Sequence, residues 1–377
     1  MANMFDYLTW RGDLTLAQSP FQDVDSLILS TLAYVFFDGI VPESMEETVT
    51  IAQAAELYFF RSEEQWKSRV DEDLELLAHL AESERFAKME LCGYVNKLDL
   101  AAEKQFSALT ILTGYDMAFV AYRGTDSSSV GWKEDFNMSF MDMVPAQQEA
   151  GIYLCQAAKH FAGNFRVGGH SKGGNLAVFA AAMCPKDVQE RIVSVYNHDG
   201  PGFREGMLQR EGYRAILPRV QTFVPQSSVI GMLLEHEEAY IVIRSSQKGI
   251  MQHDPYSWEI IGKDFVRLEE LTEESRLLDQ TVKTWLNELP EKQREKFVDT
   301  VYEGISVLPV DEFGEIQISP KIALQALRAW GDEDEETKKI IGDVLKLLLQ
   351  AARKTAQEYT MTLPKLGNWE RRNENEK

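Results

Sequence analysis

The sequence predicts an α/β fold, with a mostly parallel sheet covered by helices on both faces. Short β-prone runs alternate with helical runs between about residues 105 and 260, the pattern of parallel strands joined by crossover helices. One strand-to-helix junction in this region is a glycine-rich turn around a single serine. After about residue 265 the β-prone runs stop, and the sequence becomes helical and highly charged. These observations separate a sheet-containing domain from a helical extension.

The first 100 residues or so are predicted to be mainly helical. An acidic segment at residues 23–25 precedes an apolar run, and acidic residues favour the first turn of a helix. Helices are expected over residues 26–36, 47–60 and 63–82. We interpret these helices as an N-terminal cap on the sheet domain.

The pattern then changes to strands. Residues 106–113 and 117–122 flank a Gly-Tyr-Asp turn, which predicts a β-hairpin. Further strands are expected over residues 164–167, 192–197, 220–224 and 239–244, with helices near residues 146–161 and 176–183.

The C-terminal part is expected to be helical over residues 274–306 and 320–359, followed by a frayed, charged tail from Trp369 to Lys377. We therefore divide the chain into an α/β domain over residues 1–265, which includes the N-terminal helices, and a C-terminal helical extension over residues 266–377.

Composition argues against several classes of function. The 377 residues are 44% hydrophobic, enough for a sizeable core, and carry a net charge of −21. Such an acidic chain is a poor partner for nucleic acids and for anionic membranes. The three cysteines, Cys92, Cys155 and Cys184, are too few and too far apart for a disulfide framework or a metal site.

The sequence also lacks targeting and membrane signals. The N-terminus has no basic region followed by an apolar core, and no run of about twenty apolar residues occurs. We therefore expect a soluble, cytoplasmic protein with no stable membrane insertion. A non-classical export route stays an alternative.

The most informative segment is Gly169-His170-Ser171-Lys172-Gly173, a G-x-S-x-G motif. A β-prone run precedes it and an apolar helical run follows it. This context is typical of a nucleophile elbow, the turn that exposes the catalytic serine in an α/β-hydrolase fold. The flanking glycines allow the close backbone approach that the turn needs. The following helix directs its N-terminal amides toward the developing oxyanion.

A serine nucleophile needs a base, and in this fold the chain order is serine, acid, histidine. His253 lies in a loop just after the last predicted parallel strand, where the base is expected. The alternative is an ordinary loop histidine beside the Asp254-Pro255 turn. The other histidines fit less well: His79 and His160 precede the serine, His170 lies in the elbow and points away from the base position, His198 abuts a strand end, and His236 lies in a solvated acidic loop.

The triad acid is predicted to be Asp199, at the carboxyl end of the strand after the elbow. The next strand ends in Pro225-Gln226-Ser227-Ser228, which contains no carboxylate. A plain Asp-Gly-Pro turn is the structural alternative for Asp199. Other candidates are Asp254, the glutamates at 235, 237 and 238, and a serine, Ser227 or Ser228, that orients the base.

The oxyanion needs two donors. The residue after the nucleophile, Lys172, would supply its amide. Thr125 follows the strand that ends at Tyr122 and would supply its amide and its hydroxyl. A simple turn is the alternative interpretation of the Arg123-Gly124-Thr125 segment.

These motifs resemble those of class 3, or fungal-type, lipases. The segment Tyr122-Arg123-Gly124-Thr125, followed by Trp132-Lys133-Glu134-Asp135-Phe136, is similar to their F-R-G-[TS]…D-W-x-x-D segment. Gly169–Gly174 is similar to their G-H-S-L-G-G elbow, and His253–Tyr256 to their H-x-x-Y end.

More closely, about residues 3–265 resemble a bacterial family of lipase-like α/β hydrolases described as a domain of unknown function. The shared segments are residues 6–13, 169–177, 199–202 and 253–258. The resemblance implies an α/β-hydrolase fold and assigns roles to Ser171, His253 and Thr125.

Two positions depart from the lipase pattern. The lipases carry their acid in a D-x-V-P segment, where this chain has Phe223-Val224-Pro225-Gln226-Ser227-Ser228. Lys172 stands where the lipases have leucine. The lysine is open to two interpretations: a contact with an anionic group of the substrate, or an exposed side chain without a role.

Together the motifs predict a serine hydrolase that cleaves carboxylic esters through an acyl-enzyme on Ser171. The substrate would be a small acyl ester or a lipid, and the reaction needs no metal or organic cofactor. The charged C-terminal helices offer a site for a protein partner. The alternatives are a catalytically weak or inactive hydrolase-fold scaffold, and an acyltransferase or thioesterase.

Overall fold

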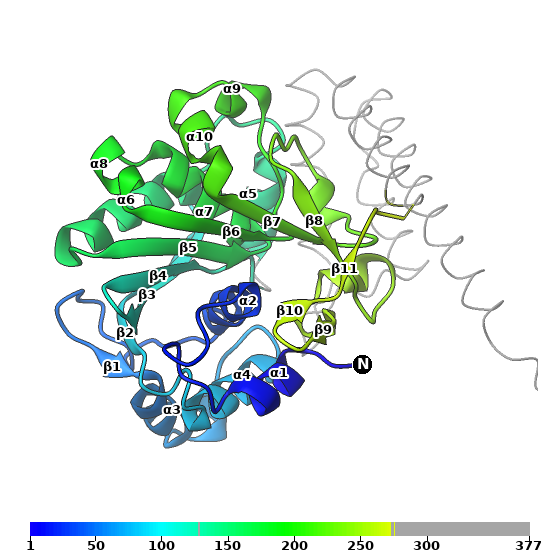
Figure 1. Cartoon of the computed structure of the whole chain (residues 1–377). Coiled ribbons are helices and arrows are strands. Elements are labelled where there is room, and N and C mark those ends of the chain that lie inside the picture. Colours follow the sequence, from blue (N-terminus) through cyan, green and yellow to red (C-terminus); the bar gives the residue numbers. More distant parts are fainter. Residues whose placement is uncertain (127–128, 273–274, 276–377) are drawn as a thin grey trace, which may run out of the picture. The chain divides into compact units, whose positions relative to one another are not determined.

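The computed structural model describes residues 1–126, 129–272 and 275, all within the first of the chain's two compact units, residues 1–316 (Figure 1). The predicted C-terminal helices and the charged tail lie outside the described residues, apart from Ser275. None of the described helices is long and apolar enough to cross a membrane.

The main sheet is mixed, and its centre is parallel. Its strand order is β1-β2-β3-β4-β5-β6-β7-β8-β11, with parallel pairing from β4 to β8 and antiparallel pairing elsewhere. The strands are β1 (Val49–Thr50), β2 (Glu90–Asp99), β3 (Lys104–Gly114), β4 (Met117–Tyr122), β5 (Asn164–His170), β6 (Ile192–His198), β7 (Val220–Pro225), β8 (Tyr240–Ile243) and β11 (Arg267–Leu268); β9 (Ile260–Ile261) and β10 (Asp264–Phe265) form a separate antiparallel pair.

Helices cover both faces of this sheet (Figure 1). The helices α1 (Met4–Arg11), α2 (Asp23–Leu32), α3 (Ile51–Phe59) and α4 (Asp71–Glu82) lie on one side. The other side carries α5 (Ser129–Asn137), α6 (Pro145–His160), α7 (Lys172–Met183), α8 (Lys186–Glu190), α9 (Glu205–Leu208) and α10 (Glu211–Ile216). Short 3-10 turns are η1 (Glu63–Gln65), η2 (Leu217–Arg219), η3 (Ile230–Met232), η4 (Gly249–His253) and η5 (Pro255–Ser257).

Two hydrophobic cores result, one on each face of the sheet. Alternate side chains of a strand point to opposite faces. In β4, Phe119 and Ala121 are buried with the N-terminal helices, whereas Ala118, Val120 and Tyr122 are buried with α6 and α7. The central strands are therefore apolar on both sides, as the predicted parallel arrangement requires.

The prediction of an α/β fold with a mostly parallel sheet is confirmed, and the strands predicted from residue 106 onward have bounds within a few residues of those expected. The strand β2 was not expected, since the first 100 residues were predicted to be mainly helical. Its apolar pattern is interrupted at Gly93, where φ is +62° and the register with β3 shifts. This irregularity breaks the alternation by which a strand is recognised in a sequence.

The helix predicted over residues 63–82 is also shorter than expected. Its α-helical part, α4, begins only at Asp71. The carboxylate of Asp73 accepts hydrogen bonds from the amides of Arg69 and Val70, both at 3.0 Å, and so caps the helix there.

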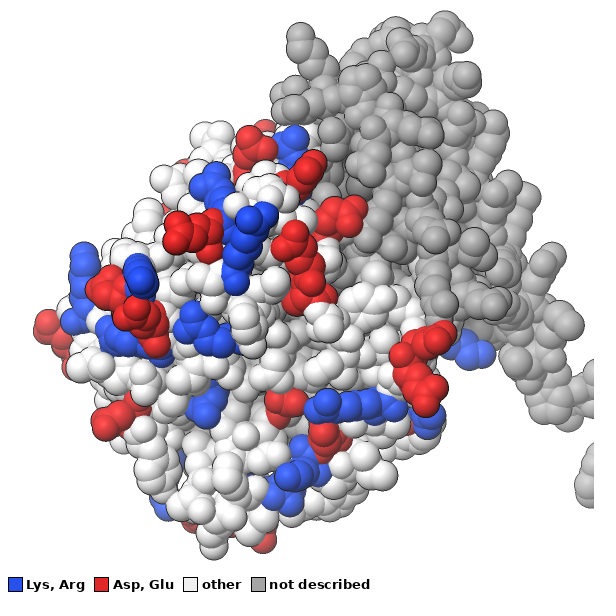
Figure 2. All heavy atoms as spheres, turned by 45° about the horizontal axis from the view of Figure 1, so that its top comes forward, with Lys and Arg blue, Asp and Glu red and all other residues white. Residues whose placement is uncertain are grey.

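Charged side chains are mixed on the surface. On the face that Figure 2 shows, lysine and arginine side chains are interspersed with aspartate and glutamate. This face presents no continuous basic surface, although the whole chain has a net charge of −21.

A buried ion pair holds the N-terminal helices together. The Arg85 and Asp25 side chains are both fully buried, and Arg85 Nε donates to Asp25 Oδ1 at 2.8 Å. Arg85 Nη1 also donates to the carbonyls of Leu14 and Ser19, at 3.0 and 2.9 Å. The Tyr7 hydroxyl donates to the same Asp25 oxygen at 2.8 Å. This network joins α1, α2 and the segment that leads into β2.

We predict that Arg85→Met lowers the free energy of unfolding by about 3–5 kcal/mol, because it leaves the Asp25 carboxylate buried without its cationic partner. Chemical denaturation measures this change. The matched control is Lys88→Met, which removes an exposed ion pair with Glu84 at 2.8 Å. An equally small effect of both substitutions would contradict the importance of the buried pair.

Candidate functional site

Ser171 lies in a tight turn between β5 and α7, as the motif predicts. Its backbone has φ of 58° and ψ of −134°, an unusual conformation for a residue with a side chain. The Ser171 amide donates to the carbonyl of His198 at 2.9 Å, which fixes the turn against the end of β6. A strained backbone held by the neighbouring strand is the geometry of a nucleophile elbow.

Glycine is required on both sides of this serine. A Cβ on Gly169 would lie 2.2 Å from the carbonyl carbon of Gly173. A Cβ on Gly173 would lie 2.1 Å from the carbonyl oxygen of Tyr122. Both contacts are with backbone, which cannot move aside as a flexible side chain can. The two glycines therefore let the elbow pack against itself and against the end of β4.

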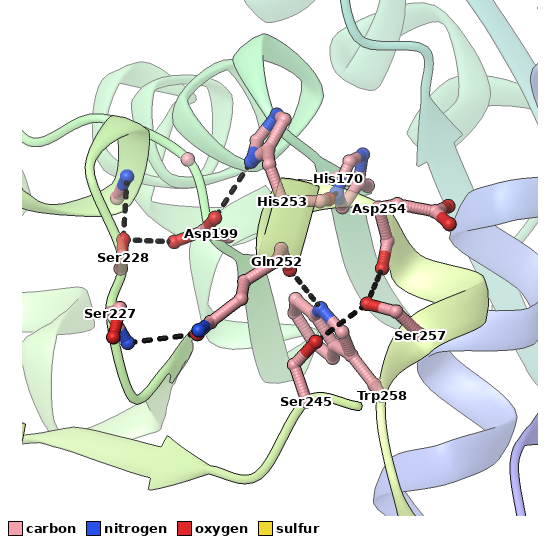
Figure 3. A network of polar contacts seen from close by, with 12 residues as sticks. His170, Asp199, Ser227, Ser228, Ser245, Gln252, His253, Asp254, Ser257 and Trp258 are labelled. Atoms are coloured by element: carbon pink, nitrogen blue, oxygen red, sulfur yellow. Dashed lines mark hydrogen bonds and ion pairs between the residues drawn. The ribbon is translucent and has the colours of Figure 1, made fainter. Parts of the chain in front are cut away.

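Asp199 and His253 are in direct contact (Figure 3). Asp199 follows β6 directly, has φ of 54° and is completely buried. Its Oδ2 accepts a hydrogen bond from His253 Nδ1 at 2.7 Å. Because Nδ1 carries the proton of this bond, the neutral ring has its lone pair on Nε2. This is the tautomer that a general base needs.

The loop that carries His253 is held by the elbow itself. His170 Nε2 donates to the carbonyl of His253 at 2.7 Å, and the two imidazole rings have centroids 4.6 Å apart. The Tyr34 hydroxyl then donates to His170 Nδ1 at 2.9 Å. Burial, followed by electrostatic interactions with His253 and Arg69, lowers the pKa of His170 well below its usual value of 6.5. The His170 ring is therefore neutral and adds no charge beside His253.

Neighbouring residues fix the same loop from the other side. Gln252 Oε1 accepts from the Ser227 amide at 2.9 Å, and the Gln252 carbonyl accepts from Trp258 Nε1 at 3.0 Å (Figure 3). The Tyr256 hydroxyl donates to Asp73 Oδ1 of α4 at 2.8 Å. Further toward the N-terminus, Asn3 Nδ2 donates to the Tyr256 carbonyl at 3.2 Å.

Thr125 lies beside the elbow. A Cβ on Gly124 would come within 3.1 Å of Ser171 Cβ and 2.6 Å of the His170 carbonyl oxygen, so this turn passes directly over the serine. The Thr125 hydroxyl bonds to Asp135 Oδ2 at 2.5 Å. Sequence reasoning assigned no role to Asp135, although it belongs to the segment that resembles the lipases.

Burial raises the pKa of Asp135 from 3.8 to about 6. The charge of Lys172 and the hydrogen bond from Thr125 lower this pKa, but their effect is smaller than that of burial. Its Oδ1 is buried and has no hydrogen-bond partner among the described residues. Ionising a buried carboxylate costs free energy when one of its oxygens has no hydrogen-bond donor, which agrees with the raised pKa of Asp135.

Lys172 is buried, which corrects both interpretations of its side chain. The residue is only 1% exposed. Its Nζ donates to Glu134 Oε2 at 3.0 Å and to the Gln105 carbonyl at 2.9 Å. Glu134 Oε1 in turn accepts from the Ala146 amide at 2.8 Å. The lysine therefore joins α7 to α5, α6 and β3, and its side chain does not extend toward solvent.

Four of the alternative candidates bond to other groups: His198, His236, Glu238 and Asp254. His198 is fully buried, and its Nε2 lies 3.0 Å from Ser26 Oγ. Burial lowers the pKa of His198 to about 3.

His236 is not in a solvated loop as expected: its side chain is 6% exposed, and Nδ1 lies 2.9 Å from Glu238 Oε1. Burial alone would raise the pKa of Glu238, but His236 and Thr222 lower it to about 2. Asp254 Oδ1 accepts from the Tyr256 amide at 3.2 Å.

We predict that Asp135→Asn stabilises the protein at pH 7–8 by about 1–3 kcal/mol. The raised pKa means that the stability contributed by Asp135 is complete below pH 3.8 and is lost as the pH rises through about 6. The asparagine amide never ionises, so the advantage of the variant should disappear by pH 4. Denaturation midpoints of both proteins from pH 4 to 8 test this, and a difference that does not change with pH would contradict it.

Comparison with known proteins gives one matching family and several similar solved structures. A protein-family model, described as Mbeg1-like, matches residues 80–303. Similar solved structures include a Rhizomucor miehei lipase in complex with its propeptide, 12% identical over 47% of this chain and 70% of that chain, with a TM-score of 0.35. Another is the M37 lipase, 14% identical over 65% of this chain and 84% of that chain, with a TM-score of 0.36. No curated protein matches the sequence. Because the family match spans more than half of the chain, the protein belongs to the Mbeg1-like family, a lipase-like domain of unknown function.

Proposed function

We propose that this protein is a serine hydrolase of the α/β-hydrolase fold, which cleaves carboxylic esters through an acyl-enzyme on Ser171. The observation that carries the proposal is the 2.7 Å contact between Asp199 and His253 beside the strained turn at Ser171. The site combines a carboxylate, an imidazole and a serine in an elbow turn, all at the carboxyl ends of the parallel strands. This combination favours acyl transfer over the alternative of a non-catalytic scaffold.

In the proposed reaction Ser171 Oγ attacks the ester carbonyl, and its proton passes to His253 Nε2. The alcohol leaves with that proton, and the acyl group stays on Ser171. Water then attacks the acyl-enzyme, with His253 acting again as base, and the carboxylic acid is released. Asp199 holds the ring in the required tautomer and stabilises the imidazolium.

The oxyanion would be bound by the amides of Lys172 and Thr125. The hydroxyl of Thr125 has one proton, which it can give to Asp135 or to the oxyanion. When Asp135 is protonated it can donate to Thr125, and the threonine proton is then available for the oxyanion. The first turn of α7 adds the positive end of its helix dipole.

The substrate would be a small acyl ester or a lipid, and a protein partner would bind through the C-terminal helices. We place the hydrolase domain over residues 1–265, with α1–α4 as its N-terminal cap, and a helical extension over residues 266–377. The short strand β11 adds Arg267 and Leu268 to the main sheet beyond this boundary.

A fluorophosphonate probe tests the nucleophile. The parent protein should be labelled on Ser171, because the elbow turn and His253 activate its hydroxyl. Ser171→Ala should not be labelled. Equal labelling of the two proteins, or no labelling of the parent, would overturn the proposed function.

Asp199→Asn is expected to lower kcat for a short p-nitrophenyl ester by about 10⁴, because the amide favours the wrong tautomer of His253. Little change in stability is expected, since the substitution keeps the shape of the turn. The matched control is Asp254→Asn, next to His253 in sequence, whose carboxylate caps the Tyr256 amide instead. Full activity of Asp199→Asn, or an equal loss in the control, would assign Asp199 a structural role.

A further inference from the structure

We propose that Ser228 is a positioning residue for the hydrolysis, which acts by holding the carboxylate of Asp199 toward His253. The inference rests on the proposed function, because it assigns a partner to the proposed triad acid. Ser228 lies in the segment after β7, three residues beyond the Val224-Pro225 pair that matches the V-P of the lipases' D-x-V-P segment. In this chain the acid comes from the end of β6 instead, and a hydroxyl from the β7 end supports it.

The contact is short and completely buried. Ser228 Oγ donates to Asp199 Oδ1 at 2.5 Å, while Asp199 Oδ2 accepts from His253 (Figure 3). Asp199 is 0% exposed and Ser228 is 2% exposed. Within the described residues, each carboxylate oxygen is therefore bonded to one side chain, and a buried carboxylate depends on such donors to stay charged.

The direction of the Ser228 proton is also set by its surroundings. The Gly231 amide donates to Ser228 Oγ at 3.1 Å, so one lone pair of the hydroxyl is already used. The single proton then points to Asp199. Gly231 is close to the same carboxylate, since a Cβ there would lie 2.1 Å from Asp199 Oδ1. The turn η3, which contains Gly231, therefore packs closely against the side chains of Asp199 and Ser228.

The loop that presents Ser228 is held by the first residues after the sheet. Ser275 Oγ donates to the Ser228 carbonyl at 2.7 Å, and the Thr272 amide donates to the Gln226 carbonyl at 2.8 Å. The neighbouring Ser227 faces this segment and not the acid, with its Oγ 3.1 Å from Thr272 Oγ1. Adjacent serines therefore have separate partners, which provides a matched pair for mutagenesis.

The experiment compares Ser228→Ala with Ser227→Ala in the full chain, using the rate of fluorophosphonate labelling and the kcat and KM of ester hydrolysis. Ser228→Ala should lower the labelling rate and kcat by about 10–100-fold with little change in KM, because the acid loses its orientation but no substrate contact is removed. Ser227→Ala should stay near the parent rate. Ser228→Cys keeps a weak donor and should fall between the two.

A double-mutant cycle separates positioning from general destabilisation. In an Asp199→Asn background, Ser228→Ala should cause little further loss in labelling rate, since the group that it positions is already inactive. The same loss in both backgrounds, or a parent-like rate for Ser228→Ala, would overturn the inference. A parent protein that is not labelled at all would instead overturn the proposed function.

Discussion

The imidazole of His170 is the link on which the arrangement of the site depends. It is next to Ser171 in the chain, it donates to the backbone of His253, and it accepts from Tyr34 beyond the end of α2. Three segments that are distant in sequence are joined by one side chain. In the neutral ring, Nε2 is the donor and Nδ1 the acceptor of these two bonds. Burial holds it in that state by lowering its pKa.

The parallel centre of the sheet explains why Asp199 and Ser228 lie close together. Neighbouring parallel strands end at the same edge, so side chains that follow β6 and β7 occupy adjacent positions. In this chain Asp199 follows β6 and Ser228 lies beyond β7, and the two side chains are hydrogen-bonded. Asp199 in turn contacts His253 in the loop that follows β8.

Much of the fold was predictable because the central strands obey simple rules of alternation and order. Ser171 could be proposed from its glycine-rich motif, and His253 and Asp199 from their positions after strands and the comparison with other candidates. The structure brings the last two into contact. Their catalytic roles stay predictions. Local patterns did not reveal β2, where Gly93 interrupts the strand, nor the burial of Lys172, whose partner Glu134 is 38 residues away. The Thr125–Asp135 and Ser228–Asp199 contacts depend in the same way on tertiary structure.

The bonds of Tyr256 to the N-terminal helices have a consequence for how the protein is made. Its hydroxyl and its carbonyl contact residues that precede it by 183 and 253 positions. Such distant contacts form late, because closing a long loop is slow compared with forming local structure. During synthesis the N-terminal helices leave the ribosome long before the segment that contains His253. The turn at Ser171 can therefore fold while the loop that carries His253 is still missing, and the contact between Asp199 and His253 forms only after most of the domain has been translated.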